Sequence, residues 1–295
     1  MDSNRNISRR EAISTLAKAA GAAGGLMMAG AASASTVPSQ AAAGKGQLRH
    51  SVCKWCYPKI ALEDLCAKGG DLGLVSVELL SEGDWATCAK HGLTCAVANG
   101  PSGISDGWNL PADHDKLVKE SERLLPLVAA AKLPQMIVFS GNRRGMTDAE
   151  GMANCEKGLK RITPLAEQLG VTVIMELLNS KRDHKDYMCD HTAWGVELVR
   201  RVGSPRFKLL YDIYHMQIME GDVIDTIQKN VQYISHFHTG GVPGRNEIDD
   251  TQELNYPRIC RAIIDTGFSG YIAQEFIPKR DALTSLKQGI QLCTV

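Results

Sequence analysis

The chain has 295 residues, with 33 basic and 33 acidic side chains, so its formal net charge is zero. Hydrophobic residues make up 44% and charged residues 22% of the sequence, a balance typical of a globular protein. The lack of a basic excess argues against a nucleic-acid partner, because such a partner requires a positively charged face. A small-molecule ligand is the expectation that remains.

The first 34 residues have the features of an export signal. Ser8–Ile13 (SRREAI) forms a twin-arginine core, and an Ala/Gly-rich, weakly hydrophobic run follows over about 19–32. Residues 32–34 (ASA) resemble a small-residue cleavage site. The hydrophobic run is too short and too rich in glycine for a stable membrane span. We therefore expect residues 1–34 to direct export to the periplasm by the twin-arginine pathway, with no membrane partner after cleavage.

The composition of residues 35–49 is typical of a flexible linker, which leaves 50–295 for one catalytic domain. Nine cysteines in an exported chain suggest a disulfide framework. Twin-arginine export carries folded proteins, however, so these thiols would be buried while the chain is still in the reducing cytoplasm. Most of the cysteines lie within apolar segments, and we expect them to be small core residues.

Short apolar runs alternate with amphipathic, helix-like segments along this domain, and the clearest helices are expected over 113–132, 148–169, 191–202 and 256–266. Several runs are rich in Val, Ile, Phe or Tyr, as buried parallel strands are. The eight expected strands lie at 51–55, 74–79, 93–98, 136–139, 171–176, 207–212, 233–238 and 271–276.

Eight strands that alternate with helices predict an α/β fold, a single closed (β/α)8 TIM barrel, for which about 250 residues suffice. The alternative is an open, doubly wound sheet. Such a sheet usually carries a glycine-rich phosphate loop after its first strand, and the sequence WCYP that follows Lys54 is unlike such a loop.

Four potential metal ligands end the last four expected strands, with spacings of 36, 26 and 37 residues: Glu176, Asp212, His238 and Glu275. Each spacing corresponds to one strand–helix unit, so all four side chains should meet at the carboxyl ends of the strands, where barrel enzymes build their active sites. Three carboxylates there would repel one another. A divalent cation removes that conflict, and this ligand set suits Mg²⁺, Mn²⁺ or Co²⁺. We therefore predict one divalent metal ion.

The segments MELLNSKRDHKDY, LLYDIYHMQ, HFHTGGVPGRNE, ELNYP and QEF resemble the hydroxypyruvate isomerase branch of the sugar isomerase/epimerase (xylose isomerase-like) barrel superfamily. The resemblance extends from about Ser51 to the C-terminus and is most specific over 171–276. It implies that the same four residues hold the metal ion. It also implies that Glu176 and Glu275 act as the acid/base pair.

The resemblance implies substrate contacts as well. His215 stands in the motif D-x-x-H and Arg245 in H-x-x-x-x-P-G-R, and both positions match residues that contact substrate oxygens. Glu253 belongs to a matching E-x-N-Y segment, and we expect it to have a structural role or to support the site without touching the ligand. Three residues at the ends of the first two strands are expected to line the pocket, with barrel packing or a buried ion pair as the alternative: Lys54, Trp55 and Glu78.

The sequence thus predicts a metal-dependent aldose–ketose isomerase. Its substrate would be hydroxypyruvate, converted to 2-hydroxy-3-oxopropanoate through an enediolate, or a similar small hydroxy-carbonyl compound. The export signal leaves two alternatives open. The first is an exported sugar epimerase or keto-glycoside lyase with the same metal and glutamate pair. The second is a non-catalytic periplasmic sugar-binding barrel, against which the intact glutamate pair argues. A homo-oligomer is compatible with the sequence.

Overall fold

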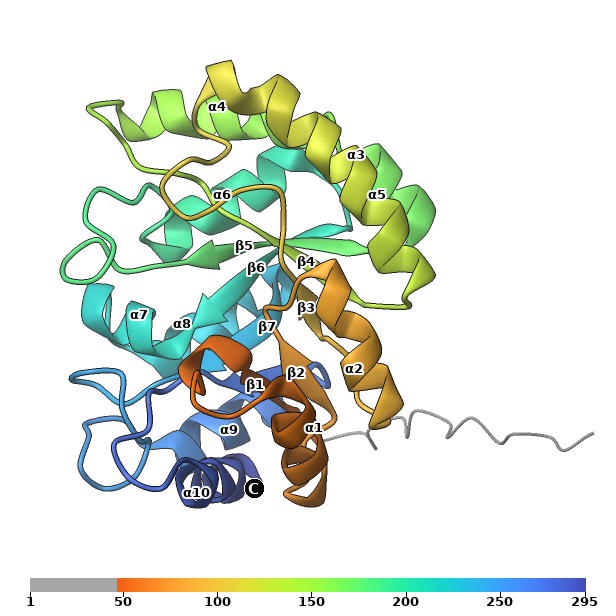
Figure 1. The fold of residues 1–295 in the computed structure, drawn as a ribbon. Coiled ribbons are helices and arrows are strands. Elements are labelled where there is room, and N and C mark those ends of the chain that lie inside the picture. Colours follow the sequence, from red (N-terminus) through yellow and green to blue (C-terminus); the bar gives the residue numbers. More distant parts are fainter. Residues whose placement is uncertain (1–46) are drawn as a thin grey trace, which may run out of the picture. The chain divides into compact units, whose positions relative to one another are not determined.

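The computed structural model describes residues 47–295, which form a (β/α)8 barrel (Figure 1). Eight parallel strands are hydrogen-bonded in the order β2-β1-β8-β7-β6-β5-β4-β3, which confirms the predicted fold class. The expected signal over 1–34 and most of the expected linker lie outside the described residues. Within 47–295, no helix is both long enough and apolar enough to span a membrane.

All eight expected strands are present, although several are shorter than the apolar runs that predicted them. Isolated bridges, Ser76 with Thr94 and Leu80 with Ala98, connect the β2 side of the sheet to the β3 side. The strands are β1 (Arg49–Cys53), β2 (Ser76–Glu78), β3 (Val97–Ala98), β4 (Gln135–Val138), β5 (Thr172–Leu177), β6 (Phe207–Asp212), β7 (Ile234–Thr239) and β8 (Tyr271–Gln274).

Helices surround the strands in Figure 1, and one expected helix is divided in two. The pattern predicted a single helix over 148–169, whereas the structure has α4 and α5 there. Pro164 stands in the first turn of α5, where its missing N–H removes no helix bond, so the second helix begins there. The α-helices of the described residues are α1 (Leu62–Asp71), α2 (Trp85–Lys90), α3 (His114–Ala130), α4 (Asp148–Leu159), α5 (Thr163–Leu169), α6 (Thr192–Val202), α7 (Ile213–Met219), α8 (Val223–Asn230), α9 (Tyr256–Asp265) and α10 (Ala282–Cys293).

Two apolar clusters hold the barrel together and fix where the polar strand ends lie. The larger one contains residues from both strands and helices, and it includes all nine cysteines. Every cysteine is buried and none forms a disulfide, as the sequence predicted. The smaller cluster takes residues from five strands and from the position just before β3, as expected for the filled interior of such a barrel: Ala96, Val97, Ile137, Ile174, Leu210 and Tyr271. Polar side chains just beyond this inner cluster therefore gather at the carboxyl ends of the strands.

Candidate metal centre and active site

The four residues predicted to bind metal meet at the carboxyl ends of β5 to β8. Asp212 ends β6 and pairs with His238 of β7, Glu176 is the penultimate residue of β5, and Glu275 follows β8. One ligand atom from each of the four lies within 4.8 Å of those of the other three. All four side chains are buried. The four residues that the sequence places at strand ends therefore form one compact group that is shielded from water.

His238 directs one ring nitrogen at the three carboxylates. Its Nδ1 lies 2.6 Å from Glu275 Oε2, 3.3 Å from Glu176 Oε1 and 4.0 Å from Asp212 Oδ2. In spite of these short distances, the buried Nδ1 has no hydrogen-bond partner of suitable geometry. A buried nitrogen that faces three carboxylates without a hydrogen bond fits a site where a divalent cation is held by one imidazole and three carboxylates.

The other ring nitrogen of His238 faces Glu78. Of the two roles expected for Glu78, lining the pocket or forming a buried ion pair, the structure has the second: Glu78 is fully buried and is absent from the cavity lining. Its Oε1 accepts a hydrogen bond from Nε2 of His238 at 2.9 Å and lies 2.9 Å from Nε2 of His236. Burial opposes the ionisation of Glu78, but the two histidines outweigh burial and lower its pKa to about 2. The Glu78 carboxylate therefore holds the Nε2–H of His238 and leaves Nδ1 directed at the three carboxylates, the orientation that a metal-binding imidazole needs.

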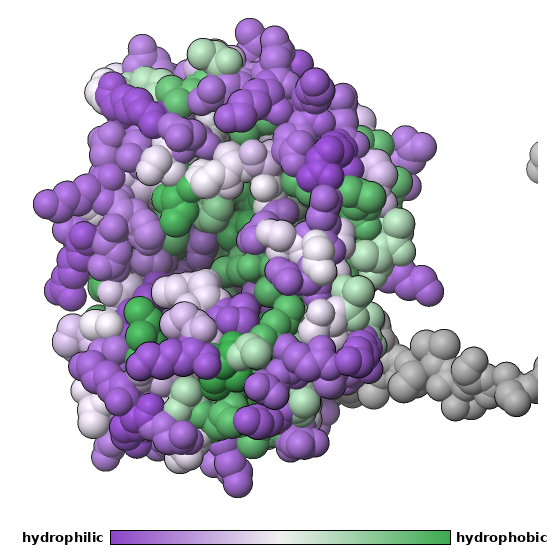
Figure 2. Space-filling view, in the orientation of Figure 1, coloured by the Kyte–Doolittle hydropathy of each residue, from purple (hydrophilic) through white to green (hydrophobic). Residues whose placement is uncertain are grey.

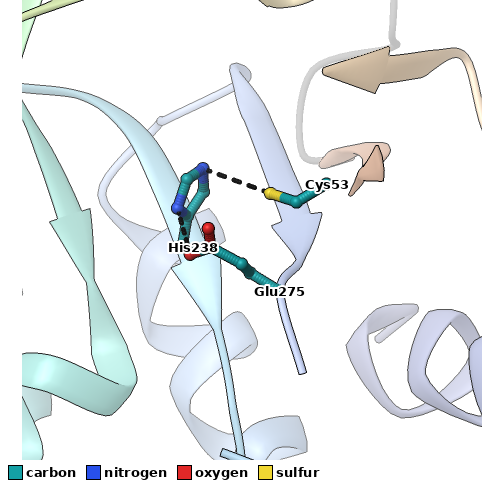
Figure 3. A group of neighbouring side chains, drawn as sticks. All are labelled: Cys53, His238 and Glu275. Atoms are coloured by element: carbon teal, nitrogen blue, oxygen red, sulfur yellow. Dashed lines mark hydrogen bonds and ion pairs between the residues drawn. The ribbon is translucent and has the colours of Figure 1, made fainter. Parts of the chain in front are cut away.

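Cys53 touches the same histidine from the end of β1. Its Sγ lies 3.8 Å from Nε2 of His238, so that Cys53 and Glu275 approach the imidazole from two sides, as Figure 3 shows. Burial raises the pKa of the Cys53 thiol well above its usual value. Cys53 therefore stays a neutral thiol that packs against the imidazole.

Arg245 provides the positive charge nearest to the carboxylates. Its Nη2 lies 2.6 Å from Asp212 Oδ2 and also forms an ion pair with Glu275 Oε2. Burial opposes the ionisation of Glu275, but Arg245 and His238 outweigh burial and hold the pKa of Glu275 well below its usual range. Glu176 behaves differently, since burial together with the neighbouring Glu275 carboxylate raises its pKa to about 7. The two glutamates therefore differ in proton affinity.

His215 is buried between Asn179 and Arg245. The Oδ1 atom of Asn179 accepts hydrogen bonds of 3.0 Å from the backbone N–H groups of Arg182 and Asp183, so its Nδ2 is directed at Nδ1 of His215, 2.6 Å away. Burial lowers the pKa of His215 well below its usual value and favours the neutral ring. Nη1 of Arg245, which can only donate, lies 2.7 Å from Nε2, so both ring nitrogens of His215 face a donor. If Arg245 moves away, Nε2 becomes free to contact an oxygen of a ligand.

A cavity of about 690 Å³ opens onto this cluster. Trp55 lines the cavity as expected, and its Nε1 donates a 2.7 Å hydrogen bond to Glu275 Oε1. Lys54 does not line it, because a short 3-10 turn follows β1 and the Lys54 Nζ atom instead donates to the backbone oxygen of Tyr57 at 3.2 Å. Both residues had been predicted to contact substrate.

Glu253 also lies away from the cluster that it was expected to support. It is exposed, and its Oε1 accepts a 3.2 Å hydrogen bond from Gln217. Two residues that do support the site were not predicted from the sequence, His236 and Asn179. The H-x-H spacing in β7 places His236 on the same face as His238, and Asn179 follows Glu176 by three residues, so both positions carried a signal.

Replacing Glu78 should weaken metal binding. In Glu78→Gln the charge behind His238 is lost at constant volume, so we expect metal affinity to fall about 10- to 100-fold, as it does when such supporting carboxylates are removed. Calorimetric titration with Mn²⁺ measures the affinity, and circular dichroism reports whether the barrel is folded. Glu253→Gln is the matched control on the surface. Equal Mn²⁺ affinity in folded Glu78→Gln and in the parent would contradict the assigned role.

Metal binding should depend on pH near neutrality. Because the pKa of Glu176 is raised to about 7, its carboxyl is mostly protonated below pH 7 and must lose that proton to bind a cation. The imidazole of His238 must lose a proton as well, because its pKa is also raised. Affinity should therefore fall as pH decreases through neutrality, by up to about tenfold per pH unit for each proton that must be lost. Titrations in buffers of different ionisation enthalpy count the protons released, and we expect more than one at pH 6. Affinity that is constant from pH 6 to 8 would exclude this assignment.

Known proteins resemble this chain over most of the barrel. The sequence model of the family described as "Xylose isomerase-like TIM barrel" matches residues 85–293. A putative hydroxypyruvate isomerase of Homo sapiens is 27% identical over 249 residues, which are 79% of this chain and 90% of the relative. A 2-oxo-tetronate isomerase of Cupriavidus necator is 36% identical over 110 residues, 37% of this chain and 42% of that protein. A crystal structure of an AP endonuclease, family 2, from Brucella melitensis shares the fold, with a TM-score of 0.75 at 21% identity over 83% of this chain and 99% of the other. The chain belongs to the xylose isomerase-like TIM barrel family.

Proposed function

We propose that this chain is a metal-dependent isomerase that acts on hydroxypyruvate or a similar small hydroxy-carbonyl compound. One observation carries the proposal: Glu176 and Glu275 share one buried cluster but differ in proton affinity. Such a pair can hold a proton on one carboxyl and accept a proton on the other. The names of the human and Cupriavidus necator relatives, both isomerases, support the same reaction type.

The donor set supports a hard or borderline divalent cation, Mg²⁺, Mn²⁺ or Co²⁺, held by Glu176, Asp212, His238 and Glu275. When bound, such an ion supplies positive charge that stabilises the negative charge of an enediolate. Glu78 and Trp55 keep two of the ligands in place, since Glu78 holds the imidazole of His238 and Trp55 holds one oxygen of Glu275.

The chain's own residues would carry the proton transfer. Isomerisation of hydroxypyruvate removes a proton from the hydroxymethyl carbon and returns one to the neighbouring carbonyl carbon. One of the two glutamates removes the first proton and the other delivers the second, steps to which positioned groups contribute roughly 10²- to 10⁴-fold each. His215 would donate its Nε2–H to the carbonyl oxygen as charge develops there.

Arg245 fits the substrate carboxylate in this proposal. Its guanidinium is buried beside Asp212 and Glu275 and faces the cavity, and such a group binds a carboxylate through two parallel hydrogen bonds. If Arg245 turns toward the substrate, it also leaves the Nε2–H of His215 free for the carbonyl oxygen.

Removing either glutamate should abolish turnover. For Glu176→Gln and Glu275→Gln we expect kcat/KM to fall at least about a hundredfold, because a glutamine neither takes up nor releases the proton. Solvent deuterium incorporated into hydroxypyruvate, followed by NMR, measures proton removal separately from product formation. The metal content of each variant distinguishes loss of a ligand from loss of the acid/base group, and Glu253→Gln is the control. If metal-loaded parent protein incorporates no deuterium into any small hydroxy-carbonyl compound, the proposal is wrong.

We further propose that the twin-arginine segment exports the protein, so that it meets its substrate outside the cytoplasm. Replacement of Arg9 and Arg10 by lysine should retain the protein in the cytoplasm, because the paired arginines define the signal. Cell fractionation followed by immunoblotting makes the measurement. Equal periplasmic amounts of the parent and the double-lysine variant would contradict export by this pathway.

A further inference from the structure

We propose that the natural ligand of the cavity carries an alkyl or aryl group next to its hydroxy-carbonyl head, and that the first half of the barrel binds this apolar group. The inference rests on the proposed function only for the chemistry of the head. It concerns a set of residues that the proton transfer described above does not use.

The charged side chains of the cavity lining all come from the second half of the chain, which also contributes Leu178, Tyr214 and Ile277, whereas the first half contributes mainly apolar side chains. The charged and histidine side chains of the lining come from β5 to β8 and the segments that follow them: Glu176, Asp183, His184, His215, Arg245 and Glu275. The opposite side comes from β2 to β4 and the segments that follow them, and we call its residues the apolar wall: Leu79, Ile104, Ile137 and Phe139.

The apolar wall offers few hydrogen bonds to a ligand. Asn99 is the polar side chain that this half of the barrel adds to the described lining, and its Nδ2 already donates to Ser81 Oγ at 3.3 Å. Hydroxyl groups of a sugar placed against the wall would exchange hydrogen bonds with water for contacts with carbon atoms, which is unfavourable. An alkyl or aryl group placed there loses no hydrogen bond and leaves water, which is favourable.

The wall is an extension of the barrel interior. Leu79 and Phe139 pack against the inner apolar cluster, to which Ile137 belongs. Leu79 has a φ of 57°, in the left-handed region that leucine rarely adopts. Strained backbone of this kind is kept where the position of a side chain matters, and it persists mostly at binding and catalytic sites.

Apolar side chains also stand exposed at the cavity. Trp55 is 47% exposed and Ile277 43% exposed, and these are two of the four exposed large hydrophobic residues of the described chain. Both line the cavity. Figure 2 shows hydrophobic residues gathered in a hollow near the centre of the face drawn, within a mostly hydrophilic surface. Exposed apolar surface concentrated at a cavity marks a place that a ligand covers.

The cavity is larger than the hydroxy-carbonyl head of the ligand alone would fill. Its volume of about 690 Å³ equals that of about 23 water molecules in the liquid, at roughly 30 Å³ each. A three-carbon acid bound at the charged side would displace only a few of these and would leave the apolar wall in contact with water. A ligand with a substituent of several carbon atoms would cover the wall as well.

The test compares hydroxypyruvate with analogues that carry a methyl, propyl or benzyl group on the hydroxyl-bearing carbon. From methyl to propyl we expect kcat/KM to rise about fourfold for each buried methylene group. An analogue of the same length whose side chain is hydroxylated should show no such gain. In Ile104→Asn the gain should disappear, whereas Leu127→Asn, an exposed position on the outer helix α3, should retain it.

A binding measurement separates this inference from the proposed function. Calorimetry with the metal-loaded protein compares phenylbutanoate with butanoate, neither of which can be isomerised. Tighter binding of phenylbutanoate that is lost in Ile104→Asn supports the apolar wall even if no analogue is turned over. Turnover of hydroxypyruvate with no gain from any substituent, or an equal gain in Ile104→Asn, overturns the inference and leaves the isomerase proposal standing.

Discussion

The site is organised by the repulsion among three carboxylates that are buried together. Two like charges 4 Å apart repel by about 4 kcal/mol at the effective dielectric constant of a protein, so Glu176, Asp212 and Glu275 cannot all be ionised without nearby positive charge. The surrounding residues meet this constraint in different ways. Arg245 forms ion pairs with two of the carboxylates, and the raised pKa of Glu176, about 7, lets the third one hold a proton part of the time at neutral pH. A divalent cation would meet the same constraint and allow all three to ionise.

Much of this arrangement could be predicted because parallel strands align their carboxyl ends. Four ligand-type residues at intervals of one strand–helix unit had to meet if the barrel formed, whatever the exact register. Glu78 shows where such reasoning stops. In the sequence it is one more acid at the end of an apolar strand, but in the structure it contacts His238, 160 positions away. Only the packing of β2 against β7 across the barrel distinguishes a supporting carboxylate from one that lines the pocket.

Lys54 and Glu253 lie outside the cavity lining for reasons that the sequence shows only in part. A 3-10 turn directly after β1 decides where Lys54 points, and turns of three residues leave little pattern in a sequence. Glu253 stands in a motif shared with relatives, but its neighbour Asn255 caps α9 and Tyr256 binds the backbone of Gly240, so the motif also serves the chain path. The division of the expected helix over 148–169 has a visible cause in the sequence, because Pro164 favours the start of a new helix at that point.

The β2 and β3 sides of the barrel are paired over fewer residues than the strands that carry the charged groups. The strands β5, β6 and β7 pair along most of their length, whereas the β2 and β3 sides are joined by isolated bridges and β3 has two residues. The charged groups thus stand on the half with the longer strand pairing, whereas Leu79 and Ile104 of the apolar wall follow the two strands that isolated bridges join. Substitutions and length changes in the segment after β3 would therefore reach the apolar wall while the strand ends that carry the four predicted metal ligands keep their pairing. In a family that shares one barrel, this asymmetry provides a route by which new substrate preferences arise without loss of the reaction chemistry.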